Sequence, residues 1–116
     1  MVIAQGDIMW AELPVPAGSE AGFRRPVVVV QGEPFNRSRI GTVVCVPLTS
    51  SLRWAEAPGN VLLRRSSTGL EKDSVANVSQ ILTIDRDFLQ QSVGKLSRRE
   101  LQSILSGIDL VLGRKA

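Results

Sequence analysis

The pattern of apolar positions predicts β-strands along the first two thirds of the chain. Residues 7–13 alternate as one strand does, and residues 27–30 are apolar at every position, which is typical of a central strand buried on both faces. The residues of the first strand expected to face a core are Ile8, Trp10 and Leu13. Pro26 cannot donate a ladder hydrogen bond, so we expect it to begin the second strand. Residues 15–22, between the two strands, are expected to form a loop.

A second continuous apolar run covers residues 42–48, with Thr49 at its carboxyl end. Pro47 within this run indicates that strand pairing stops or bulges there. Shorter strands are predicted at residues 60–64, 74–78 and 80–84, of which the last is expected to be the final strand. Short strands at regular spacing, with turn signals between them, favour an all-β barrel or sandwich.

The periodicity changes near the C-terminus, where it predicts an amphipathic helix. Ser97 and Glu100 have the spacing of a capping box, and Gly113 stands where a helix C-terminal stop is expected. Between them, apolar residues recur at steps of three and four. This stripe consists of Leu101, Ile104, Leu105, Ile108, Val111 and Leu112. We therefore predict one domain, residues 1–116, built as a small β-barrel closed by a C-terminal amphipathic α-helix.

Composition excludes several kinds of catalytic and metal site. The 116 residues include no histidine and one cysteine, so imidazole catalysis, a disulfide framework and a zinc cage are excluded. Cys45 lies in an apolar run and is expected to be an inert core residue in a reducing compartment. Asp85 and Asp87, with Arg86 between them, are interpreted as a helix cap rather than a magnesium pair. We expect no metal ion and no cofactor.

Hydropathy bears on assembly and location. A mean hydropathy of +0.08 is high for so short a chain and predicts self-association, in the simplest case as a dimer. No apolar run approaches the roughly 20 residues that span a bilayer, and the first residues lack the basic and apolar regions of a signal peptide. The expected location is cytoplasmic, with no membrane partner.

Positive charge is concentrated in the middle of the chain. Residues 1–22 carry a net charge of −3, whereas residues 23–72 carry +5. Of the 14 basic residues 11 are arginine, whose planar guanidinium suits phosphate oxygens and base stacking. This distribution favours an anionic partner, with nucleic acid as the default, although such charge can also serve only solubility.

Two polar side chains at the ends of predicted strands are candidates for chemistry. Arg25 precedes Pro26, so its backbone is held while its guanidinium can bind an anion. Thr49 ends a buried strand and can direct its hydroxyl to the same ligand. Each has an ordinary alternative: Arg25 as a surface residue paired with Glu20, and Thr49 as an edge residue of high β-propensity.

The two tryptophans are expected to have different surroundings. Trp10 is interpreted as a core residue of the first strand rather than as a platform on which a base stacks. Trp54 follows Arg53 in a polar loop and is expected to be exposed, where it could stack on an RNA base or be buried at a subunit contact.

Five short segments occur in order along nearly the whole chain. They are residues 6–10 (GDIMW), 18–29 (GSEAGFRRPVVV), 46–50 (VPLTS), 73–75 (DSV) and 80–85 (QILTID). Together they resemble the MazF/PemK family of toxin endoribonucleases. The resemblance implies an SH3-like barrel, a cytoplasmic bacterial homodimer, and cleavage of single-stranded RNA, including mRNA, at short sequence motifs. It also implies neutralisation by a cognate antitoxin whose acidic peptide would be attracted by the basic middle of the chain.

Carried over residue by residue, the family's catalytic arginine falls on Arg25 and its catalytic threonine on Thr49. Glu20 matches a loop acid near the site in many members. Where some members of the PemK branch have an arginine and an aspartate for acid/base steps, this sequence has Asn77 and Ser79. The departure leaves open which groups transfer protons. The substrate contacts implied are Ser19, Glu20, Arg24, Ser50, Asn77 and Gln80.

The chemistry of such a site can be stated from RNA itself. The 2′-hydroxyl is a built-in nucleophile, so positioning it and stabilising the developing phosphorane charge are enough to cut the strand. The expected products are a 2′,3′-cyclic phosphate and a 5′-hydroxyl. One alternative is a non-enzymatic toxin of the gyrase-poison type, which has the same barrel; those poisons present a C-terminal aromatic residue, and this chain ends in residues 113–116 without one. Another is an RNA binder without catalysis.

Overall fold

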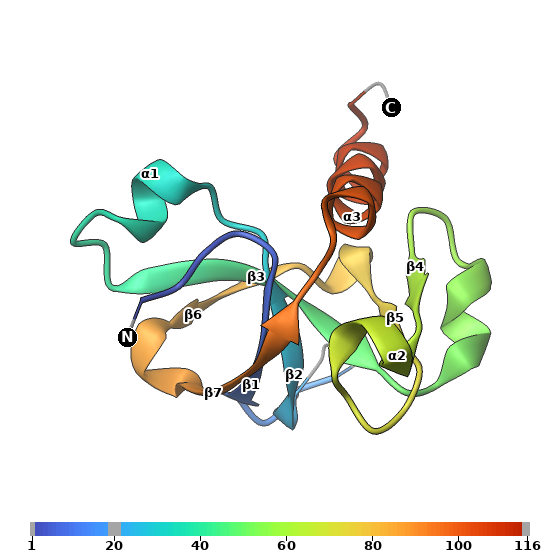
Figure 1. Cartoon of the computed structure of the whole chain (residues 1–116), viewed down its shortest axis with the longest axis horizontal. Coiled ribbons are helices and arrows are strands. Elements are labelled where there is room, and N and C mark those ends of the chain that lie inside the picture. Colours follow the sequence, from blue (N-terminus) through green and yellow to red (C-terminus); the bar gives the residue numbers. More distant parts are fainter. Residues whose placement is uncertain (1, 19–21, 115–116) are drawn as a thin grey trace.

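The molecule is a curled antiparallel sheet with a C-terminal helix packed against it (Figure 1). The structure is a computed structural model that describes residues 2–18 and 22–114. The strands are β1 (Asp7–Leu13), β2 (Phe23–Val29), β3 (Thr42–Thr49), β4 (Val61–Leu63), β5 (Ser74–Ala76), β6 (Leu82–Asp85) and β7 (Leu89–Lys95). The helices are α1 (Glu33–Asn36), α2 (Arg65–Thr68) and α3 (Arg98–Val111), with 3₁₀ turns η1 (Leu52–Glu56), η2 (Val78–Gln80) and η3 (Arg86–Phe88). The predicted mainly-β barrel with a C-terminal helix is confirmed as a half-barrel.

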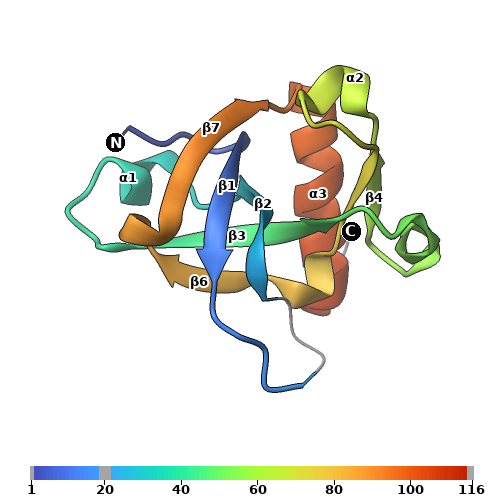
Figure 2. The ribbon, with the colours of Figure 1, turned by 90° about the horizontal axis from the view of Figure 1, so that it is seen from below.

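Strand β3 connects the two halves of the sheet because it changes partners along its length. Residues 42–45 pair with β6, and residues 48–49 pair with β5. On this edge Pro47 lies between the two pairings, as predicted, whereas on the other edge it is paired with Val27 of β2. The sheet order is β4-β5-β3-β2-β1-β7, and Figure 2 shows β3 running across the molecule with β6 beside its first half.

Hydrophobic residues form two clusters, one on each face of the sheet. The cluster enclosed by the curled sheet contains Ile3, Met9, Ala11, Leu13, Val27, Val29, Val43, Cys45, Ile84 and Leu89. The cluster between the sheet and α3 contains Ile8, Val28, Val30, Val46, Leu48, Leu63, Ala76, Val78, Leu96 and Ile104. Strand β1 supplies Ile8 to one cluster and Met9 to the other, so it is buried on both faces. The prediction that Trp10 is a core residue is wrong, because this side chain is half-buried at the wall of a pocket.

The start of β2 also differs from the prediction. The strand begins at Phe23, so Pro26 lies inside it, opposite Trp10 of β1. Pairing with β3 begins only at Val27. Pro26 therefore lies where β1 alone flanks the strand, which is a position that tolerates a missing N–H.

Strand β7 is the one strand, within the described residues, that the sequence analysis missed: residues 80–84 were expected to form the final strand, but β6 is followed by another. The turn between them is capped as predicted: the carboxylate of Asp85 accepts a 2.8 Å hydrogen bond from the amide of Asp87. Only Leu89 of β7 is buried, so the strand shows no apolar alternation that a periodicity argument could detect. It pairs with β1 and extends the sheet at that edge.

Helix α3 follows its predicted signals at both ends. Ser97 and Glu100 form the reciprocal capping box, and Gly113 ends the helix with φ of +73°. Ile104 is fully buried against the sheet, whereas Leu112, at the end of the stripe, is 62% exposed. The stripe therefore packs on the sheet along its first turns and leaves its C-terminal end uncovered. Within residues 2–18 and 22–114, no helix combines the length and apolar character needed to cross a membrane.

Candidate functional site

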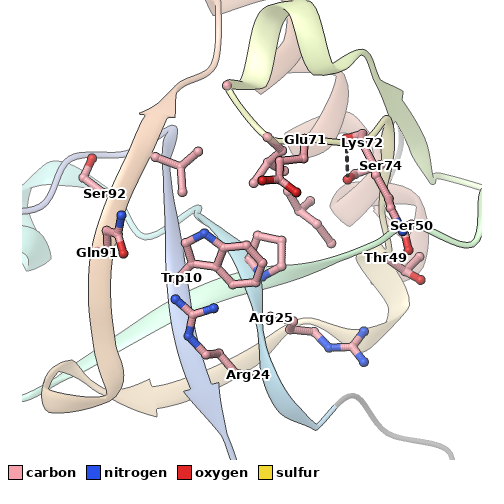
Figure 3. A pocket seen from close by; sticks show the side chains of 15 residues that line it. Trp10, Arg24, Arg25, Thr49, Ser50, Glu71, Lys72, Ser74, Gln91 and Ser92 are labelled. Carbon is pink, nitrogen blue, oxygen red and sulfur yellow. Dashed lines mark hydrogen bonds between the residues drawn. The ribbon is translucent and has the colours of Figure 1, made fainter.

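Arg25 and Thr49 line the same open pocket, which has a volume of about 680 Å³ (Figure 3). The lining residues are Trp10, Arg24, Arg25, Pro26, Leu48, Thr49, Ser50, Gly69, Leu70, Glu71, Lys72, Ser74, Gln91, Ser92 and Val93. They come from β1, β2, the end of β3 and the residue after it, the segment between α2 and β5, the first residue of β5, and β7. The expectation that the arginine and the threonine share one cleft is therefore met.

Arg25 is positioned by strand pairing of its backbone and by a hydrogen bond from its side chain. It lies in the part of β2 that only β1 flanks, and its Nε donates a 3.1 Å hydrogen bond to the carbonyl oxygen of Gly22. The side chain is half-buried. Figure 3 shows its guanidinium extending from β2 toward the side of the pocket on which Thr49 lies. Ser19 and Glu20, including the ion pair considered for Arg25, fall outside the described residues.

Thr49 is the last residue of β3, and its partner on β5 is Val75. Its hydroxyl oxygen accepts a 3.2 Å hydrogen bond from the amide of Ser51. Since this bond occupies a lone pair, the hydroxyl proton can be donated to a ligand. Ser50 is exposed beside it in the pocket wall.

Arg24 and Trp10 form a cation–π pair on the other side of the pocket. The Cζ atom of Arg24 lies 4.3 Å from the centroid of the Trp10 ring. The Nε of Arg24 donates a 2.8 Å hydrogen bond to Oε1 of Gln90 in β7. The guanidinium is thus fixed over the indole by two contacts.

The segment between α2 and β5 forms a further wall that the sequence analysis did not single out. It contributes Glu71 and Lys72, and Figure 3 shows the Glu71 carboxylate at the pocket. Asp73 anchors the segment by accepting a 2.8 Å bond from the amide of Arg65 and by pairing with Arg64 at 3.3 Å. The bond from Arg65, the larger influence, and the interactions with Arg64 hold the pKa of Asp73 below its usual value. No periodicity marks this wall, because it is a loop held by one carboxylate.

Asn77 and Gln80 are not among the residues that line the pocket. The amide of Asn77 donates to the carbonyl of Pro47 at 3.0 Å, and its side-chain oxygen lies 3.4 Å from both Asn60 Nδ2 and Ser79 Oγ. Gln80 ends η2, with its amide bonded to the carbonyl of Asn77 at 3.0 Å. The amide of Asn77 therefore holds β3 at Pro47, near the end of that strand.

Trp54 and Cys45 have the predicted exposures. Trp54 is 44% exposed on η1, next to Arg53, and lies outside the pocket wall. Cys45 is fully buried, and burial raises the pKa of its thiol to about 12. The thiol is therefore protonated and unreactive at neutral pH.

The charge of the pocket suits an anionic ligand. Among the described residues, its lining includes the cationic side chains of Arg24, Arg25 and Lys72 and one carboxylate, that of Glu71. Among the described residues there is no group of three or more histidine, cysteine, aspartate or glutamate side chains that could hold a metal ion. The groups available in the pocket are therefore guanidinium, ammonium, carboxylate, hydroxyl and amide.

Comparison with known proteins identifies related chains over almost the full length. Residues 4–112 match the family model described as PemK-like, MazF-like toxin of type II toxin-antitoxin system. Endoribonuclease MazF6 of Mycobacterium tuberculosis is 40% identical over 112 residues, which cover 97% of this chain and 98% of that protein. Endoribonuclease MazF of Staphylococcus saprophyticus is 33% identical, covering 97% and 92%.

Solved structures share the fold. MazF from Deinococcus radiodurans superimposes with a TM-score of 0.81 at 23% identity, covering 97% of this chain and 98% of that chain. An endoribonuclease in complex with its cognate antitoxin, from a mycobacterial species, gives a TM-score of 0.72 at 22% identity, covering 99% and 97%. The family match over residues 4–112, the curated relatives and the half-barrel agree with one another. The chain belongs to the family of PemK-like, MazF-like toxins of type II toxin–antitoxin systems.

Proposed function

We propose that this toxin endoribonuclease cuts single-stranded RNA, including mRNA, by activating the 2′-hydroxyl of the RNA itself, with Arg25 and Thr49 binding the reacting phosphate. The observation that carries the proposal is that these two side chains, from β2 and from the end of β3, line one open pocket with a cationic lining. A guanidinium offers several N–H donors, and Thr49 adds an oriented hydroxyl. Such donors stabilise charge that develops on the phosphate oxygens.

The reaction is a transfer within the RNA. The 2′-oxygen forms a bond to phosphorus while the bond from phosphorus to the 5′-oxygen breaks, which leaves a 2′,3′-cyclic phosphate and a 5′-hydroxyl. This chemistry requires no metal ion or cofactor, because the nucleophile belongs to the substrate and the protein supplies the compensating positive charge. The RNA motif at the cut is expected to depend on the pocket and on the segment between β1 and β2.

Proton transfer is assigned to Glu71. An arginine guanidinium stays protonated in proteins and is a poor base, whereas a carboxylate can accept the 2′-hydroxyl proton. Glu71 is the carboxylate in the described lining of the pocket, on the segment that Asp73 anchors. The leaving 5′-oxygen takes up a proton from water at the open mouth of the pocket.

The remaining predicted contacts fall into three groups. Arg24 and Ser50 line the pocket and are proposed to bind the RNA backbone or a base directly. Ser19 and Glu20 are proposed as contacts from the segment between β1 and β2. Asn77 and Gln80 are proposed to act through the end of β3, which the amide of Asn77 holds at Pro47.

Two partners are proposed besides RNA. A cognate antitoxin with an acidic segment would bind over the basic pocket and compete with RNA, as charge complementarity favours. A second copy of the chain is proposed to cover the apolar end of α3, where Leu110, Val111 and Leu112 are exposed. We propose that this homodimer acts in the bacterial cytoplasm.

The test is cleavage of a long purified RNA with and without the two side chains. Arg25→Ala and Thr49→Ala should each lower kcat/KM by about 100-fold or more, since removing one such donor typically has that effect. Arg99→Ala and Thr83→Ala are matched controls, because both residues are exposed outside the pocket wall, and both should cleave normally. Circular dichroism checks that all four variants fold. Full activity in both pocket variants, or products with 5′-phosphate ends by mass spectrometry, would overturn the proposal.

A further inference from the structure

Strand β7 forms the wall of the pocket on the side away from Thr49 (Figure 3). In a regular strand, successive side chains point to opposite faces. Here three successive residues, Gln91, Ser92 and Val93, all line the pocket. Strand β7 therefore departs from regular alternation where it lines the pocket.

The pairing of β1 with β7 explains the departure. The register shifts between Ile8 and Met9 and again between Trp10 and Ala11, so an irregularity lies on each side of the Gln91–Ser92 pair. The second shift leaves Gln90 without a partner on β1, between the partners of Trp10 and Ala11. β-Bulges of this kind redirect side chains and are common beside active sites.

The unpaired Gln90 positions Arg24. Its side-chain oxygen accepts the 2.8 Å bond from Nε of Arg24, whose guanidinium lies over the Trp10 ring. Trp10 is itself half-buried in the pocket wall and is paired with Gln91 across the two strands. The bulge thus holds the Arg24 guanidinium over the Trp10 ring, on the same side of the pocket as the exposed residues Gln91 and Ser92.

These groups match a nucleobase better than a phosphate. A flat base stacks on aromatic rings and on guanidinium planes, and its edge bonds to groups that both donate and accept. Gln91 and Ser92 supply such groups. Arg24, the cation nearest to them in Figure 3, is already engaged by Trp10 and Gln90, whereas Arg25 extends toward the Thr49 side.

We propose that Trp10, Arg24, Gln91 and Ser92 form a subsite for one nucleobase of the RNA next to the scissile phosphate. The base stacks on the Trp10–Arg24 pair, and Gln91 and Ser92 hydrogen-bond its edge. The assignment rests on the proposed cleavage at Arg25 and Thr49, and it makes β7 a determinant of the cleavage motif.

The first experiment reads the motif directly. A long RNA is digested, and the 5′ ends are sequenced to give the base frequencies at each position around the cut. Gln91→Leu and Ser92→Ala should reduce the base preference at one fixed position, by about tenfold in the ratio of preferred to disfavoured base for Gln91→Leu, and leave the other positions unchanged. Gln102→Leu is the matched control, since this glutamine is exposed on α3 outside the pocket wall, and its motif should equal that of the wild type.

The second experiment measures stacking without cleavage. Trp54→Phe leaves Trp10 as the sole tryptophan, and an RNA oligonucleotide with a 2′-deoxy nucleotide at the cut site lacks the nucleophile. Titrating this oligonucleotide should quench Trp10 fluorescence. Adding Gln91→Leu to this variant should weaken binding several-fold.

The two failures can be told apart. If wild-type protein cuts no RNA but Trp10 is quenched, the cleavage proposal fails and the base subsite stands. If RNA is cut but the motif of Gln91→Leu and Ser92→Ala matches the wild type at every position, or Trp10 fluorescence does not respond to the oligonucleotide, the subsite is overturned.

Discussion

Arg25 and Thr49 in the pocket, and Asp73 on the segment that carries Glu71, are each oriented by a backbone group. Arg25 bonds the carbonyl of Gly22, Thr49 accepts from the amide of Ser51, and Asp73 accepts from the amide of Arg65 to fix the Glu71 segment. A side chain held in this way loses little further freedom when it binds a ligand, which is the usual requirement for precise positioning. The pocket is therefore prepared before RNA arrives.

Glu71→Gln tests the proposed route of the proton. The amide keeps the size of the carboxylate but cannot accept the 2′-hydroxyl proton, so kcat should fall by about 100-fold or more while KM changes little. Glu56→Gln, on exposed η1 outside the pocket wall, is the matched control and should retain wild-type kcat. Single-turnover cleavage of a short RNA gives the rate of the chemical step for both variants. Equal rates in Glu71→Gln and wild type would show that another group moves the proton.

Among single residues, the family pattern gave some positions that line the pocket and others, Asn77 and Gln80, that do not. The resemblance pointed to Arg25 and Thr49, which lie in one pocket, but periodicity alone left each with an ordinary explanation. Trp10 was misassigned because β1 is buried on both faces, so alternation along it could not separate a core position from a pocket wall. Glu71 lies on a loop, where residue type carries no periodic signal.

At the level of elements, prediction succeeded where local physics decides the structure. The capping box and the glycine stop fixed both ends of α3, and the apolar run fixed β3. Strand β7 escaped because its side chains are mostly exposed and polar and its pairing with β1 is irregular. A strand that depends on tertiary pairing rather than on its own pattern cannot be found from periodicity.

The close contact between α3 and the turn before β4 predicts how a substitution at Gly107 changes stability. The backbones of Gly107 and Gly59 are so close that a Cβ at Gly107 would overlap the carbonyl oxygen of Gly59. Gly107→Ala should therefore destabilise the protein by about 1–3 kcal/mol, although alanine is the better helix former by about 1 kcal/mol.

Urea unfolding, followed by circular dichroism, measures this change. Ser103→Ala, on the exposed face of the same helix, is the control and should be neutral or slightly stabilising. A Gly107→Ala protein as stable as the control would mean that the turn moves away from the helix without loss.

Across the whole molecule, three carboxylates tie segments outside the sheet to one another. Glu33 accepts hydrogen bonds from Asn36 and from the amide of Gln5, and these bonds, Asn36 first, lower its pKa. Arg65 lowers the pKa of Asp73 as described above. Burial by itself would raise the pKa of Glu100, but hydrogen bonds from Ser67 and Ser97 outweigh it and lower that pKa.

The pH dependence of stability follows from these directions. A carboxyl group whose pKa is lower in the folded state stabilises the fold above its unfolded pKa, and this contribution is lost as pH falls through the folded value. With ordinary values of 4.5 for Glu33 and Glu100 and 3.8 for Asp73, the melting temperature should be insensitive to these groups above about pH 5 and fall steadily below 4.5. Scanning calorimetry from pH 7 to 3 tests this.

Glu33→Gln separates this effect from general acid denaturation. The variant should be less stable than wild type at pH 7, and the difference should shrink as pH falls below the ordinary value of 4.5, because the wild-type carboxylate then also becomes protonated. A constant difference across the whole range would contradict the role given to Glu33.

The change of partners along β3 has a consequence for how the toxin fails. Thr49 ends a strand that contributes to both hydrophobic clusters, so loosened packing on either face of the sheet reaches the reacting hydroxyl along a continuous backbone. We expect destabilising core substitutions to abolish RNA cleavage before the chain unfolds. A bacterium that carries such a variant would then survive even when its antitoxin is depleted.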